Sequence, residues 1–196
     1  MASILNVDQI NNAAGTSAVT IDASTGKPSF PNGANLPAGS VLQVVNSFLN
    51  SQVVVGTNTT FTIATINFTP KLATSKILLQ PYIAVWQGGN TNAALVLTRN
   101  GGVLSPDPAP SIFNTAPTVP TGGIRYYDDQ VYSDNYDTLQ ESMFYIDSPS
   151  TTSQVTYVFS FKTGSSTGYI NCSSAQGAAQ GYGYGSTGLV ITEIAQ

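Results

Sequence analysis

From residue 41 to the C-terminus, apolar and polar residues alternate in short runs. Val155 to Phe161 places an apolar residue at every second position, which is the period of a half-buried β-strand. Phe61 and Ile63 start a second such run whose phase then shifts to Ile66 and Phe68, and this shift predicts a β-bulge. No window of a dozen residues keeps the spacing of an amphipathic helix. The pattern therefore predicts an all-β protein.

Four further segments carry strand signals. Residues 76–86 form an apolar run that contains Pro81, which we expect at a sheet edge or a bulge because proline cannot donate to the ladder. Residues 93–98 run into Asn100-Gly101, a turn dipeptide that predicts a hairpin. Residues 143–146 and 189–194 complete a set of at least seven strands. Short strands at this spacing favour a jelly-roll-like antiparallel β-sandwich head over residues 41–196.

The first forty residues contain too few apolar side chains for a core of their own. Their strand-like pieces would be stable only when paired with other copies or with a partner. We therefore expect residues 1–40 to form a short extended β stem and linker for oligomerisation or attachment, with a disordered tail as the alternative. The candidate contacts are Leu5, Val7, Ile10, Val19 and Ile21.

The low charge of the chain and its lack of targeting segments restrict its predicted partners and location. Charged residues make up only 8% of the 196, the net charge is -4, and no cluster of Lys or Arg occurs, so we expect no binding of nucleic acid or anionic membrane. With no signal peptide and no apolar run long enough for a membrane span, we expect synthesis in a cytoplasm and no membrane insertion. The single cysteine, Cys172, excludes an intrachain disulfide.

The chain contains no histidine, which excludes Ser-His-Asp and Cys-His catalysis and histidine zinc sites. Paired carboxylates could still act on glycosides or hold Ca²⁺, and the acidic cluster of Asp128, Asp129, Asp134, Asp137 and Glu141 is the place to consider. Its spacing is not that of an EF-hand loop, and the G-x-G-x-x-G match at residues 183–188 precedes a strand and opens no helix. We expect no enzyme, no metal and no cofactor.

Residues 123–140, GIRYYDDQVYSDNYDTLQ, crowd four tyrosines and four aspartates into a weakly charged chain. Tyrosine offers a rigid ring with a hydrogen-bonding hydroxyl, and Asp pairs well with polar groups, so the stretch favours a contact surface. A second loop, residues 181–188, is rich in Gly and Tyr and extends this predicted contact surface. Core or inter-subunit packing of some of the rings remains the alternative. The receptor-contact candidates are Tyr126, Tyr127, Asp128, Asp129, Tyr132, Asp134, Tyr136, Tyr182 and Tyr184.

Five segments carry a resemblance to a known family, namely residues 3–45 (SILNVDQINN to VLQVV), 75–86, 95–104, 144–174 (FYIDSPSTTS to INCSS) and 186–194. They resemble bacteriophage virion fibre proteins, especially those of marine and cyanobacterial phages. The resemblance implies a trimeric virion structural protein, made in the host cytoplasm, that is fixed to other virion proteins through residues 1–40. The predicted stem is short, and this favours a short tail fibre whose loops contact a host glycan or protein. A capsid head fibre, a decoration protein or another tail component without receptor binding is the alternative.

Overall fold

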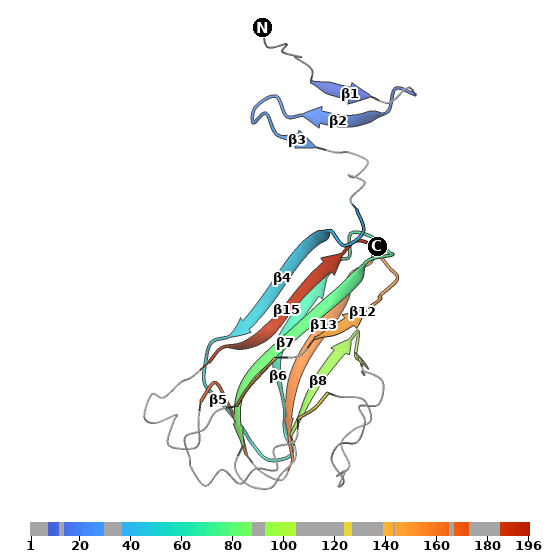
Figure 1. The fold of residues 1–196 in the computed structure, drawn as a ribbon. Coiled ribbons are helices and arrows are strands. Elements are labelled where there is room, and N and C mark those ends of the chain that lie inside the picture. Colours follow the sequence, from blue (N-terminus) through green and yellow to red (C-terminus); the bar gives the residue numbers. More distant parts are fainter. Residues whose placement is uncertain are drawn as a thin grey trace. The chain divides into compact units, whose positions relative to one another are not determined.

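The computed structural model describes residues 8–11, 14–29, 37–87, 93–104, 124–126, 139–142, 144–164, 167–172 and 185–196. These residues divide into two compact units, residues 1–37 and residues 38–196. Each unit is built from β-strands alone within the described part of the chain (Figure 1).

The N-terminal unit is a small antiparallel sheet with strand order β1-β2-β3. Its strands are β1 (Gln9–Asn11), β2 (Ser17–Ile21) and β3 (Pro28–Ser29). Ile10 pairs with Val19 across the first two strands, and Ile21 pairs with Pro28 across the second and third. None of the side chains described in this unit is fully buried.

The larger unit contains a seven-stranded antiparallel sheet. Its main path is β4 (Val41–Leu49), β15 (Thr187–Ile194), β7 (Lys76–Gln87), β14 (Gly168–Ile170) and β5 (Val53–Val55). The short strands β11 (Leu139–Ser142) and β12 (Tyr145–Asp147) also pair with β7. The C-terminus closes onto the start of this unit, because Gly39 N donates to Ala195 O and Ala195 N donates to Ser40 O.

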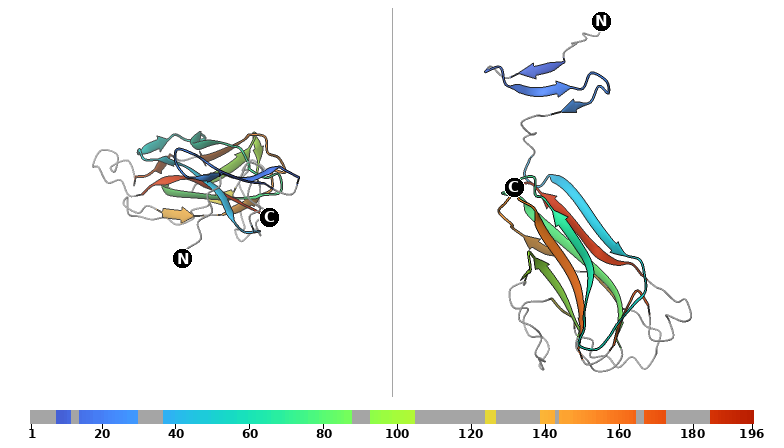
Figure 2. Two further views of the ribbon diagram at one scale, coloured as in Figure 1. Left: turned by 90° about the horizontal axis from the view of Figure 1, so that it is seen from above. Right: turned by 180° about the vertical axis from the view of Figure 1, so that it is seen from behind.

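A five-stranded antiparallel sheet forms the second layer, which can be followed from behind in Figure 2. It has the order β10 (Ile124–Tyr126), β8 (Ala93–Arg99), β13 (Val155–Thr163) and β6 (Thr60–Phe68), with β9 (Gly102–Val103) paired to β8. The two layers confirm the predicted all-β antiparallel sandwich.

The core lies between the two sheets. The inward positions of β7 and β15 supply aliphatic side chains such as Leu79 and Ile191, and β13 opposes them with Tyr157, Phe159 and Phe161. All of these side chains are fully buried. Burying one large apolar side chain stabilises a fold by about 1.5–3 kcal/mol, so this unit has a sufficient core of its own.

Two predictions of local structure are confirmed and one is wrong. The register of β13 on β6 shifts opposite the predicted phase change, and Asn100-Gly101, both with positive φ, joins β8 to β9. Pro81, however, lies in β7, which has neighbours on both sides, and it is paired with Leu189. Its missing donor is tolerated there because β11 ends at Ser142 and β12 begins at Tyr145, which interrupts the ladder beside Pro81.

Candidate functional site

An open depression lies on the outer surface of the seven-stranded sheet. It has a volume of about 360 Å³ and is lined by Gln80, Pro81, Tyr82, Ser142, Phe144 and Val190. The alternation of β7 points Gln80 and Tyr82 away from the core, and Val190 does the same on β15. Phe144 occupies the gap between β11 and β12 and keeps 77% of its surface exposed. The interrupted ladder at Pro81 thus coincides with this depression.

Gly188 shapes the surface beside the depression. It lies in β15 between Phe48 on β4 and Tyr82 on β7. Because Gly188 has no side chain, the two rings approach each other above it, with centroids 5.6 Å apart and an interplanar angle of 47°. A Cβ atom at this position would lie 2.5 Å from Ser47 O and 2.6 Å from Phe48 Cδ1. The glycine is therefore required for the Phe48–Tyr82 contact.

The chemistry of the depression is that of a contact surface. Its lining combines two aromatic rings with an amide, a hydroxyl and aliphatic carbons, and none of the lining residues is an acid or a base. Such a lining can bury apolar area and form hydrogen bonds, and it places no carboxylate or cationic side chain beside the hydroxyls of Tyr82 and Ser142 to activate them.

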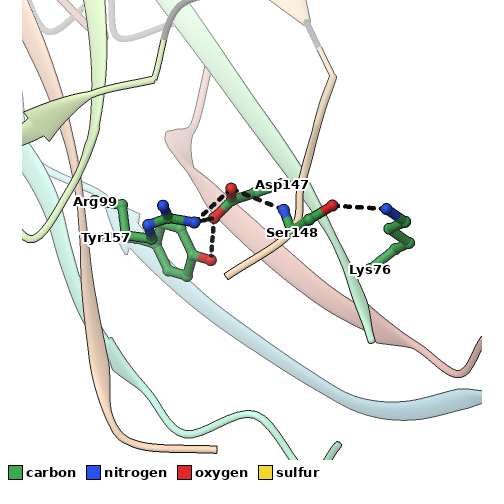
Figure 3. A network of polar contacts seen from close by, with 5 residues as sticks. All are labelled: Lys76, Arg99, Asp147, Ser148 and Tyr157. Carbon is green, nitrogen blue, oxygen red and sulfur yellow. Dashed lines mark hydrogen bonds and ion pairs between the residues drawn. The ribbon is translucent and has the colours of Figure 1, made fainter. Parts of the chain in front are cut away.

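Asp147 is buried and forms the centre of a polar network at the end of β12 (Figure 3). Arg99 Nη1 donates to both of its carboxylate oxygens, at 2.7 and 2.8 Å, and Tyr157 Oη donates to Oδ2 at 2.7 Å. Ser148 N donates to Oδ1 at 2.8 Å, while Lys76 Nζ donates to Ser148 Oγ. The carboxylate is thus fully engaged, and the network joins β7, β8, β12 and β13.

Tyr157 belongs to this network through its hydroxyl and to the core through its ring. The ring is fully buried and packs edge-on against Phe68 at a centroid distance of 6.2 Å. Burial, followed by the hydrogen bond to Asp147 and the charge of that residue, raises the pKa of Tyr157 well above its ordinary value. The hydroxyl therefore stays protonated and acts as a donor.

Glu193 is a second buried carboxylate, held by neutral donors. It lies on β15, fully buried, and Oε1 accepts hydrogen bonds from Lys71 N, Leu72 N and Ser75 Oγ at 2.7, 3.1 and 2.6 Å. Gln43 Nε2 donates to Oε2 at 2.6 Å. These bonds fix the turn between β6 and β7 to the C-terminal strand, so the role of Glu193 is structural.

A third buried cluster joins three strands through Asn171. Its Nδ2 donates to Leu49 O and Ser51 O, and its Oδ1 accepts from Thr187 Oγ1, which in turn accepts from Ala84 N. The neighbouring Cys172 is buried, and burial raises the pKa of its thiol, which makes it a poor nucleophile.

The small N-terminal sheet carries three of the predicted attachment residues. Ile10 is exposed, whereas Val19 and Ile21 are half-buried, and the pairing of Ile10 with Val19 places all three on one face of this sheet. Asp22 caps the following turn with hydrogen bonds from Ser24 and Thr25. The side-chain hydrogen bonds of Ser24 and Thr25 contribute most to lowering the pKa of Asp22 to about 2.

Most of the receptor-contact candidates lie outside the described residues. Of these candidates, only the backbone of Tyr126 is described, at the end of β10, where it pairs with Ala93. The others are Tyr127, Asp128, Asp129, Tyr132, Asp134, Tyr136, Tyr182 and Tyr184, and the attachment candidates Leu5 and Val7 also lie outside. Their contact role stays a prediction.

Sequence reasoning missed the residues that organise the sandwich interior. Arg99, Asp147 and Glu193 each end or interrupt an apolar strand run. In a chain with so few charges, a charge within a strand was the signal available, because a buried charge must find partners.

The described part of the chain contains no cluster of His, Cys, Asp or Glu side chains that could hold a metal ion. Nor does any helix described in it have the length and apolarity to cross a membrane.

No family model matches the sequence, and no curated protein matches it either. Among solved structures, the chain is similar to the crystal structure of the infectious bursal disease virus VP2 subviral particle, with a TM-score of 0.42 and 10% sequence identity. The match covers 91% of this chain and 37% of the viral chain, so the chain spans little more than a third of the length of that neighbour. Similarity this low identifies no family.

Proposed function

We propose that the chain is a structural component of a virus particle, with residues 1–37 as its attachment and oligomerisation unit and residues 38–196 as its head. The observation that carries the proposal is the contrast between the two units. The head has a continuous core, whereas the N-terminal sheet has no fully buried side chain among its described residues. A small sheet of this kind gains stability when other chains cover it.

The polar groups of the head support a structural role. The two carboxylates that are buried among the described residues of the head, Asp147 and Glu193, accept hydrogen bonds that connect strands and turns of the sandwich. A network with every member satisfied rigidifies a fold. The resemblance of the sequence to phage fibre proteins points to the same class of protein.

The finer form of the proposal is a short trimeric tail fibre whose distal loops contact the host surface. The tyrosine- and aspartate-rich stretch of residues 123–140 supports it, because these residue types suit recognition of sugars and polar protein groups. The full chain should bind host envelopes, and changing both Tyr132→Ala and Tyr136→Ala should abolish the binding. Equal binding by this double variant would remove those two residues from the contact.

Attachment is tested with the full chain and two substitutions on the apolar face of the N-terminal sheet. We expect Ile10→Asp combined with Val19→Asp to prevent incorporation into particles while thermal unfolding of the head stays unchanged. Val103→Asp is the matched control, because Val103 is an exposed apolar residue of the head with 41% of its surface accessible. Normal incorporation of the Ile10/Val19 variant would contradict the proposed role of residues 1–37.

A further inference from the structure

The outer surface of the seven-stranded sheet exposes large apolar side chains where strands β4, β15, β7 and β12 lie next to one another. Phe144 is 77% exposed, Val44 and Ile146 are each 56% exposed, and Phe48 is 42% exposed. The sheet order places β15 and β7 between β4 and β12, so these side chains belong to one continuous surface. We call this surface the outer face.

Strand register arranges the outer face in rows across the four strands. One row holds Val44, Thr192, Leu78 and Ile146. The next holds Asn46, Val190 and Gln80, and Phe144 lies beside this row, directly before the start of β12. The last holds Phe48, Gly188, Tyr82 and Ser142. The depression of about 360 Å³ lies in the second and third rows.

The size of this apolar surface argues for a protein partner. The exposed parts of its four large side chains amount to roughly 400 Å². That area is within the range of the largest patch on a typical monomer, and it is about half of what each partner contributes to a standard protein interface. The polar positions within the rows extend the contact area further.

The absence of charged residues from the three rows of the outer face favours an uncharged partner surface, such as the same face of a second copy. No residue in the three rows is charged, so the same face of another copy can approach it without repulsion between like charges. Asn46 and Gln80 are both exposed, and an amide carries donors and an acceptor, so it can pair with the same group on a copy. A charged partner would instead bury its charges without counterparts.

We propose that the outer face is the contact through which neighbouring copies of this chain associate by their head units. The proposal rests on the proposed function only in its expectation that several copies assemble, and it adds a second contact to the one assigned to residues 1–37. The aromatic pair Phe48–Tyr82, fixed above Gly188, provides a rigid part of the contact.

Sedimentation velocity of residues 38–196, a unit with its own core, isolates this contact from the N-terminal sheet. We expect association that increases with concentration up to about 1 mM, the range of weak protein contacts. Phe144→Asp combined with Ile146→Asp should weaken the association at least tenfold, since both side chains are mostly exposed in the single copy and would be buried between copies. Val44→Lys, at the far edge of the face, should weaken it as well.

Val103→Asp is the matched control, because Val103 is an exposed apolar residue on β9 of the other sheet and should leave association unchanged. Circular dichroism and thermal unfolding of each variant verify that the head is folded. A head unit that stays monomeric at about 1 mM, or that associates equally with both Asp substitutions, would overturn the proposal. If the full chain is still oligomeric in that case, the attachment role of residues 1–37 survives.

Discussion

The carboxylates of Asp147 and Glu193 are both buried in the sandwich, and each accepts hydrogen bonds from a different set of donors. Asp147 uses an arginine, a tyrosine hydroxyl and a backbone amide, whereas the donors to Glu193 are two backbone amides, a serine hydroxyl and a glutamine amide. Removing one partner from such a site leaves a buried polar group unsatisfied, which costs more than the bond itself contributes. Removing a single donor atom from either site should therefore lower the free energy of unfolding measurably.

Tyr157→Phe removes one hydroxyl from the Asp147 network, and we expect it to reduce the free energy of unfolding by about 1 kcal/mol at neutral pH. The pKa of Tyr157 is raised in the folded protein, so the unfolded chain ionises first as the pH rises past about 10. Wild type should then lose stability that the variant keeps. The difference between them should vanish near pH 11 and reverse above it.

Urea unfolding of both proteins between pH 7 and about pH 11.5 checks this expectation. The other tyrosines are common to the two proteins, so their ionisation cancels in the comparison. A stability difference that stays constant across the whole pH range would show that the Tyr157 hydroxyl titrates normally.

Strand β15 organises the seven-stranded sheet at the scale of elements. It lies between β4 and β7, supplies Leu189 and Ile191 to the core, and carries Thr187, Gly188 and Glu193 at positions that fix neighbouring segments. Two of these positions require side chains of opposite size. Gly188 must be small, whereas Glu193 must reach the turn between β6 and β7.

Gly188→Ala should destabilise the head by about 1–3 kcal/mol, because the added Cβ would lie within 2.6 Å of both Ser47 O and Phe48 Cδ1. Gly56→Ala is the matched control, since its Cβ would meet only Thr59 Oγ1 at an ordinary 3.6 Å. That substitution should be neutral or slightly stabilising. Equal unfolding midpoints for the two variants in urea would contradict the close approach of Phe48 to Gly188.

Glu193→Gln should loosen the turn between β6 and β7, because a side-chain amide replaces one carboxylate oxygen that only accepts hydrogen bonds. We expect faster hydrogen exchange at the amides of Lys71 and Leu72 and a loss of about 1–3 kcal/mol in the free energy of unfolding. Asp8→Asn, at an exposed carboxylate of the N-terminal unit, serves as the control. Unchanged exchange at both amides would mean that Glu193 does not hold the turn.

Local patterns in the sequence predicted much of this level of structure. Short apolar and alternating runs located β6, β7, β8, β13 and β15, but β4, β5, β10, β11 and β14 were not predicted. The phase change located the bulge in β6, and Asn100-Gly101 located a hairpin. The position of Pro81 could not be predicted, because it depends on where the distant strands β11 and β12 end. The outer face and the Asp147 network also depend on pairing between strands far apart in the sequence, which alternation does not specify.

At the scale of the whole molecule, the chain combines a head with a continuous core and a small sheet that has no fully buried side chain among its described residues. The low charge of the chain also matters at this scale, because weakly ionic surfaces repel one another little and so favour association between copies. Together these properties support the proposal of an assembled structural protein.

Immunogold electron microscopy tests the proposed function most directly. The proposal implies that a virus encodes the chain, so antibodies raised against residues 38–196 are applied to purified particles of that virus. If the proposed function is right, label is expected on intact particles, at the tail for a short fibre or over the capsid for a head fibre or decoration protein. Particles without label, together with chain found only in the soluble fraction of infected cells, would contradict it.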